Sequence, residues 1–152
     1  MKEVSIVGLD LAKRVCQVHA AGSDRSVVLR RKLSRGQLVP FSTELPKCTL
    51  AMEACAIAHY WAREIGKLGH DVRLIPPTYV KPFVKRQKND AVDAEAIVKA
   101  ATRPSMRFVV PKTESKQACS ILFRTRDLVV RQRTQLINAL RAHLAEQGVI
   151  AP

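Results

Sequence analysis

Aromatic side chains are scarce in this chain of 152 residues, at 5%. Proteins that hold single-stranded nucleic acid stack the bases on aromatic side chains, so this scarcity argues against a stacking platform. Long apolar runs are missing too, since no stretch approaches the 18 apolar residues of a membrane-spanning helix. The N-terminus also lacks the basic-then-apolar pattern of a secretory signal. We therefore expect a cytoplasmic protein without a membrane segment.

The sequence contains four cysteines, but no two of them form the CxxC pair that is typical of a zinc site. This pattern argues against a zinc-binding module. We expect buried, reduced thiols at Cys16, Cys48, Cys55 and Cys119.

Acidic residues are the other shortage. The chain has 13 Asp and Glu against 26 Lys and Arg, which gives a net charge of +13 and a pI near 10.2. Such a balance favours a polyanionic partner, with nucleic acid as the first candidate. The hydrophobic content of 47% is that of a globular protein long enough to bury a core.

The order of apolar patterns indicates an α/β fold, because three strands are followed by alternating helices and strands. The first strand is apolar on both faces, which is typical of a central strand covered on both sides. The last helix is longer than a domain of this size can cover, so we expect it to pack on another chain or domain. We predict strands at 4–10, 15–20, 26–33, 48–53 and 71–75, and helices at 34–41, 58–68, 90–101 and 113–147.

Four carboxylates are placed where they can converge. Asp10 and Glu53 each close an apolar strand, and ligands of open α/β sheets bind at such strand ends. Asp90 and Asp93 are three residues apart at the start of a helix and therefore share one of its faces. Carboxylate oxygens suit Mg²⁺ or Mn²⁺. Two such ions could clamp the attacking and leaving oxygens of a phosphodiester.

These carboxylates also have simpler explanations. Acidic residues in a first helical turn are stabilised by the helix dipole, and strand-end carboxylates can accept hydrogen bonds from nearby backbone amides. A basic run beside them could contact phosphates or form an ordinary solvated face. The residues that we expect to bind nucleic acid are Lys13, Lys81, Lys85, Arg86 and Lys88.

Three ordered motifs carry a more specific signal. They read VGLDLAK at 7–13, MEAC at 52–55 followed by AHYWAR at 58–63, and PP at 76–77 followed by VKPFVKRQKNDAVDA at 80–94. Together they resemble the N-terminal domain of the DEDD transposases of bacterial insertion sequences. The resemblance implies a RuvC-like, ribonuclease H-type mixed sheet flanked by helices. It also implies that Asp10, Glu53, Asp90 and Asp93 are the catalytic, Mg²⁺-binding set.

The same resemblance implies partners. In that family a separate C-terminal domain carries a nucleophilic serine, a structured guide RNA directs the choice of DNA, and long helices form a coiled coil. We accordingly expect a catalytic domain at 1–108, and a long helix at 113–148 that serves oligomerisation, as a dimer or higher, or linkage to a serine domain. Since the sequence ends at Pro152, we expect that serine domain to be absent. Ala56 and Ile57 also stand where the second motif of the family often has a glycine and another small residue.

Two alternatives to a transposase domain stay open. One is a stand-alone nuclease of the Holliday-junction resolvase type, and the other is a non-catalytic module that binds nucleic acid and oligomerises. Metal-dependent nicking by the chain alone, lost in Asp10→Asn, would favour the resolvase. Salt-sensitive binding that survives substitution of all four carboxylates would favour the module.

Overall fold

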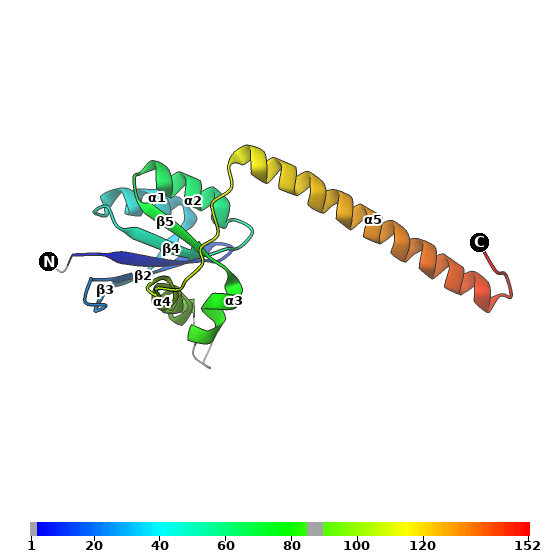
Figure 1. The fold of residues 1–152 in the computed structure, drawn as a ribbon, viewed down its shortest axis with the longest axis horizontal. Helices are drawn as coiled ribbons and strands as arrows, with labels where there is room; N and C mark the ends of the chain where they lie inside the picture. Colours follow the sequence, from blue (N-terminus) through cyan, green and yellow to red (C-terminus); the bar gives the residue numbers. More distant parts are fainter. Residues whose placement is uncertain (1–2, 85–89) are drawn as a thin grey trace. The chain divides into compact units, whose positions relative to one another are not determined.

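The computed structural model describes residues 3–84 and 90–152, and the side chains at positions 90 and 91 also lie outside that description. The chain divides into two compact units, Met1–Pro111 and Lys112–Pro152. The first unit is a sheet with helices on both faces, and the second is dominated by one long helix (Figure 1).

The sheet has five strands in the order β3-β2-β1-β4-β5, so the first strand of the chain is the central one. β1 pairs antiparallel with β2 and parallel with β4, and β4 pairs parallel with β5. The mixed α/β sheet flanked by helices, expected from the resemblance, is confirmed. The strands are β1 (Ile6–Leu11), β2 (Val15–Ala21), β3 (Val27–Ser34), β4 (Thr49–Glu53) and β5 (Asp71–Ile75).

Alternation along β1 explains why this strand is central. Val7 and Leu9 are fully buried in a core cluster on one face of the sheet, whereas Ile6 belongs to a second cluster on the other face. Since successive strand residues point to opposite faces, an uninterrupted apolar run needs cover on both sides. The sequence-based prediction of a covered central strand is therefore confirmed.

Helices of the first unit supply that cover (Figure 1). α1 (Arg35–Glu44) and α2 (Ala58–Lys67) pack on the face of Val7 and Leu9, where α2 buries Trp61 and Ile65. α3 (Pro77–Val80) and α4 (Asp90–Ala101) contribute to the core on the opposite face. The expected helix and strand positions agree with the structure to within a few residues.

Two short elements were not predicted. After β5, the chain forms α3 and the 3-10 helix η1 (Lys81–Phe83), where the sequence showed only a double proline that stops a strand. Pro77 occupies the first turn of α3, a position that lacks an intrahelical hydrogen bond and therefore tolerates proline. These elements place Lys81 beside the sheet.

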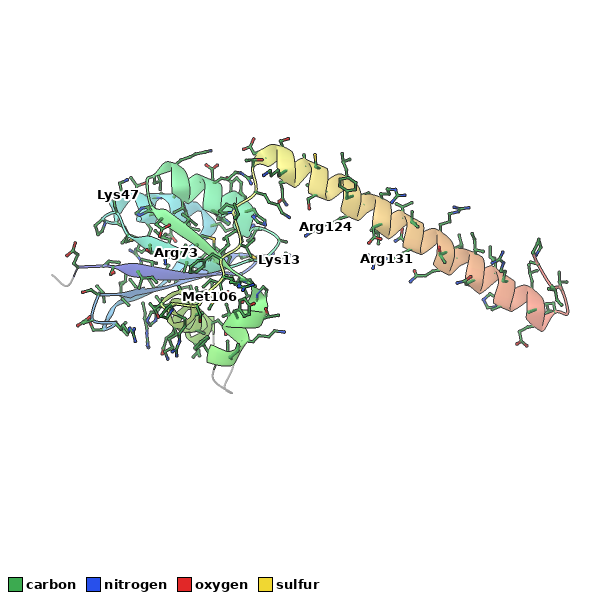
Figure 2. All side chains as sticks on the ribbon, viewed as in Figure 1. Lys13, Lys47, Arg73, Met106, Arg124 and Arg131 are labelled. Atoms are coloured by element: carbon green, nitrogen blue, oxygen red, sulfur yellow. The ribbon has the colours of Figure 1, made fainter. Side chains whose placement is uncertain are left out.

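The second unit consists mainly of α5 (Glu114–Glu146). The hydroxyl of Thr113 caps it by accepting from the backbone N–H of Lys116, and the helix ends before Gly148, whose φ is +75°. No residue of α5 is buried, and charged side chains such as Arg124 and Arg131 line it (Figure 2). Among the described residues, no helix is long and apolar enough to cross a membrane.

The cysteines correct one expectation. Cys16 and Cys48 are buried, and burial raises the pKa of both thiols. Cys55 is only half-buried and Cys119 is exposed. The prediction of four buried thiols is wrong for these two, because Cys119 lies on the unburied α5 and Cys55 lies in the turn after β4.

Candidate active site

Asp10, the penultimate residue of β1, and Glu53, the last residue of β4, lie on neighbouring parallel strands. Leu9 pairs with Met52 in the register of β1 and β4, and the two carboxylates follow one residue later on each strand. Paired positions on neighbouring strands lie about 4.8 Å apart. The sequence predicted two strand-end carboxylates, and the structure brings their strands together.

Both carboxylates stand on the face of the sheet that α4 covers. On β1, Asp10 follows Ile6 and Gly8 at intervals of two, and on β4 Glu53 follows Ala51 by two residues. Ile6 and Ala51 belong to the core cluster that includes α4. Because side chains at intervals of two share a face, Asp10 and Glu53 both point to the side of α4.

Gly8 fixes how closely α4 approaches. A β-carbon at this position would stand 2.4 Å from the carbonyl oxygen of Ala94 and 2.7 Å from Cγ2 of Val98, both in α4. Only glycine allows the helix backbone to lie this near to the central strand. Asp93 directly precedes Ala94, so this contact holds the start of α4 near the strand-end carboxylates.

The ionisation of Glu53 is affected by charged groups on α4 and η1. Its pKa is raised from its ordinary value, chiefly because the side chain is half-buried and secondly because Asp93 carries a nearby negative charge. The ammonium group of Lys81 opposes this shift. The charges of Asp93 in α4 and Lys81 in η1 therefore act on Glu53 at the end of β4.

Other predicted site residues are placed only in part. Asp90 opens α4 one turn before Asp93, but its side chain lies outside the described residues. Lys13 is exposed in the turn after β1, at the opposite end of the sheet from Lys47 (Figure 2). Among the predicted nucleic-acid contacts, those outside the described residues are Lys85, Arg86 and Lys88.

The donor set fits a divalent cation in its chemistry. Carboxylate oxygens are the ligands that Mg²⁺ and Mn²⁺ prefer, and a cation between Glu53 and Asp93 would relieve the repulsion that raises the pKa of Glu53. Among the described side chains, no group of three or more His, Cys, Asp or Glu is gathered closely enough to hold a metal ion. The four-carboxylate metal site therefore stays a prediction.

Sequence reasoning missed two residues beside the carboxylates. Asp10 pairs with Gln17 in β2, and Gln17 pairs with Lys32 in β3. These three positions form a row across the sheet on the α4 face, with Gln17 half-buried and Lys32 exposed. This row follows from the register of β1, β2 and β3, which the residue pattern alone did not fix.

Comparison with known proteins identifies a matching protein family. Over residues 7–148 the chain matches the model of IS110-type DEDD transposases, described as "Transposase". It is 54% identical over 148 residues to a probable family 20 transposase of Pseudomonas aeruginosa, covering 97% of this chain and 44% of that protein. It is 47% identical over 152 residues to the transposase for insertion sequence element IS1328 of Yersinia enterocolitica, covering 100% of this chain and 46% of that protein.

Among solved structures, the chain is similar to T. thermophilus RuvC in complex with a Holliday junction substrate. The TM-score is 0.48 and the identity 11%, over 68% of this chain and 98% of that one. The chain spans less than half the length of the two transposases that it matches.

Proposed function

Because the chain belongs to the IS110-type family of DEDD transposases, we propose that it is the metal-binding, nuclease-like part of an enzyme that cleaves and transfers DNA phosphodiesters. The observation that supports this proposal is the parallel pairing of β1 with β4, which brings the strand ends bearing Asp10 and Glu53 together on the α4 face, with α4 packed closely on Gly8. The position is one at which open α/β sheets bind their ligands.

The four acidic residues have one role in this proposal. Asp10, Glu53, Asp90 and Asp93 would hold Mg²⁺, for which Mn²⁺ can substitute. When bound, the metal supplies positive charge at the attacking and leaving oxygens of a phosphodiester. The half-burial of Glu53 limits water around these groups and strengthens their interactions. Lys81 contributes a positive charge that acts on Glu53 and is suited to a phosphate oxygen of the bound strand.

Positive side chains define the proposed path of the DNA strand. From the carboxylates, the row through Gln17 to Lys32 leads across β2 and β3 on the α4 face. Lys13 stands in the adjoining turn. A strand lying along this row meets an amide and an ammonium group, which are donors suited to phosphate oxygens. The basic residues Lys85, Arg86 and Lys88 would extend this surface beside the start of α4.

The partners follow from the family and from α5. We place a structured guide RNA among them, together with assembly of two or more copies through the exposed apolar residues of α5. Leu122 is 70% exposed and Leu136 is 63% exposed, and these two positions, with Val129 between them, repeat every seven residues. A long helix with such a stripe and no buried residue is suited to a helical partner.

Mn²⁺ binding tests the carboxylate site directly. We expect Mn²⁺ to raise the melting temperature of the wild-type chain and to give anomalous peaks among the four carboxylates in a soaked crystal. Asp10→Asn and Glu53→Gln should abolish both effects. Asp127→Asn, a matched change on α5, should leave them intact. A wild-type chain that gains no stability from Mn²⁺, even with a DNA duplex present, would contradict the proposal.

A binding module without chemistry is the second candidate. The net charge of +13 favours it, because electrostatic attraction alone can hold nucleic acid. In that case, salt-sensitive DNA binding would survive substitution of all four carboxylates, and no nicked DNA would form with Mg²⁺ or Mn²⁺ present.

A further inference from the structure

A pocket lies on the α4 face of the sheet, between the β2–β3 hairpin and the C-terminal half of α4. Its volume is about 380 Å³. His19 pairs with Gly8 in the register of β1 and β2, whereas the hairpin turn adjoins the opposite end of β1 from Asp10. The pocket is therefore separate from the carboxylates. Its polar lining consists of His19, Arg25, Glu95, Lys99, Thr102 and Arg103.

His19 is the buried polar residue of this pocket. Its side chain is only 3% exposed, and among the described residues Nδ1 has no hydrogen-bond partner. Burial lowers the pKa of the imidazole, and the positive charges of Arg30 and Lys99 lower it further against the opposing charge of Glu95. A buried ring nitrogen without a partner is unfavourable. A ligand that accepts or donates a hydrogen bond there would remove this deficit.

The charges around the pocket leave an excess of cations. Glu95 is the one carboxylate among the described lining residues, and both of its oxygens are engaged. Arg30 donates to Oε2 at 3.0 Å and Lys99 donates to Oε1 at 2.5 Å. Arg103 stacks on the ring of Phe83 at 5.2 Å but meets no carboxylate in the pocket lining, and neither does Arg25. The remaining attraction is toward an anion.

Arg25 occupies a backbone conformation that arginine rarely adopts. Its φ is +62°, and it is the only described residue other than glycine with a positive φ. The backbone N–H of Gly22 donates to Ser26 O, and that of Arg25 donates to Gly22 O, each at 3.0 Å. This is a three-residue hairpin loop, in which the third position favours glycine. An arginine in that position is strained, and strained residues cluster at functional sites.

We propose that this pocket binds a phosphate group, with Arg25, Lys99 and Arg103 supplying the positive charge and His19 lining the site. The phosphate belongs to a nucleic-acid backbone, because the chain as a whole carries the charge excess of a polyanion-binding protein. A small molecule that carries a phosphate would present the same chemistry, and the experiment below distinguishes these two sources of the phosphate. The pocket does not depend on the carboxylate site, and Asp10→Asn should leave phosphate binding unchanged.

Arg25→Gly is the informative variant, because glycine removes both the positive charge and the backbone strain. We expect its melting temperature in chloride buffer to rise, so a loss of binding cannot be ascribed to misfolding. Inorganic phosphate at constant ionic strength should stabilise the wild type. For Arg25→Gly and Arg103→Gln, the half-saturating phosphate concentration should rise at least fivefold. Arg31→Ala removes one positive charge from an exposed residue on the opposite face of β3, and this variant should behave as the wild type.

A labelled 20-base-pair DNA duplex identifies the source of the phosphate. If the nucleic-acid backbone supplies it, Arg25→Gly weakens binding and reduces the slope of log K against log salt by about 1. If phosphate binding weakens and duplex binding does not change, the pocket takes a free phosphate-bearing molecule, and the assignment to the backbone is wrong. Inorganic phosphate that fails to stabilise the wild type, or that stabilises Arg25→Gly equally well, overturns the phosphate pocket itself.

Discussion

Gly8 in the central strand lies directly against the carbonyl group of Ala94 in α4, at a distance that excludes any β-carbon. This contact joins the strand that carries Asp10 to the helix that carries Asp93. The geometry of the proposed metal site therefore depends on a residue with no side chain.

Replacing Gly8 by alanine should destabilise the fold. The added methyl group would displace helix backbone, and overpacking of this kind costs about 1–3 kcal/mol. We expect this loss in urea denaturation, together with weaker Mn²⁺ binding. Gly66→Ala is the matched control, because a β-carbon there would have no described atom within 4 Å apart from its chain neighbours and the backbone of its own helix. In the helix α2 that change should stabilise the protein by about 0.5–1 kcal/mol. Equal stability of Gly8→Ala and wild type would show that α4 is not fixed by this contact.

The buried His19 predicts acid sensitivity. Its pKa is lowered by burial, then by Arg30 and Lys99, with Glu95 opposing. The unfolded chain takes up a proton near the ordinary histidine value of about 6.5, whereas the folded chain does not. Stability should therefore fall as the pH drops below 6.5 and level off below the folded pKa. Urea denaturation in phosphate-free buffer should show a flatter dependence for His19→Gln. His143→Gln, a change on the exposed α5, should retain the wild-type slope.

Lys32 and Arg31 provide a test of the proposed DNA path. They are adjacent on β3 and both exposed, but Lys32 pairs with Gln17 on the α4 face, whereas Arg31 pairs with the core residue Val18. Lys32→Ala should weaken duplex binding and reduce its salt slope by about 1. Arg31→Ala should have a smaller effect in the same anisotropy titration. Equal losses would indicate diffuse attraction instead of a strand lying on this face.

The four cysteines should differ in reactivity. Cys119 is exposed on α5 and should react first with a thiol reagent, followed by the half-buried Cys55. Cys16 and Cys48 are buried with raised pKa values and should react only after unfolding. Mass spectrometry of the labelled native chain, with Cys119→Ser to identify the fast site, measures this order. Labelling of Cys48 in the native state would contradict the structure of this core.

The apolar stripe of α5 should control assembly. Replacing Leu136 and Leu140 together by lysine places charge in the proposed helical interface and should reduce the solution mass to that of a monomer. Thr134→Lys with Asn138→Lys adds the same charge on the other side of the helix and should leave the mass unchanged. Light scattering coupled to gel filtration gives the comparison. A wild-type chain that is already monomeric at high concentration would contradict the proposed assembly through α5.

Local patterns predicted most of the fold. The central position of β1 and the extents of α2, α4 and α5 follow from apolar spacing, capping residues and proline, which act over a few neighbours. They also predicted that Asp10 and Glu53 end strands. The register of β1, β2 and β3 depends on where each turn falls, which the residue pattern did not fix, so the row from Asp10 to Lys32 was not predicted. Nδ1 of His19 has no hydrogen-bond partner among the described residues, which depends on packing between distant segments and was therefore missed. The strain at Arg25 belongs to a local three-residue loop and was missed because an arginine does not signal a positive φ.

The parallel pairing of β1 with β4 also sets an order in time. β1, β2 and β3 are neighbours in sequence and can pair by hairpin formation as soon as they leave the ribosome, whereas β4 joins only after α1 has been synthesised. α4 follows later still. A growing chain thus carries Asp10 on a formed strand well before Glu53 and Asp93 reach it, and the proposed metal site can form only once that long-range closure is complete.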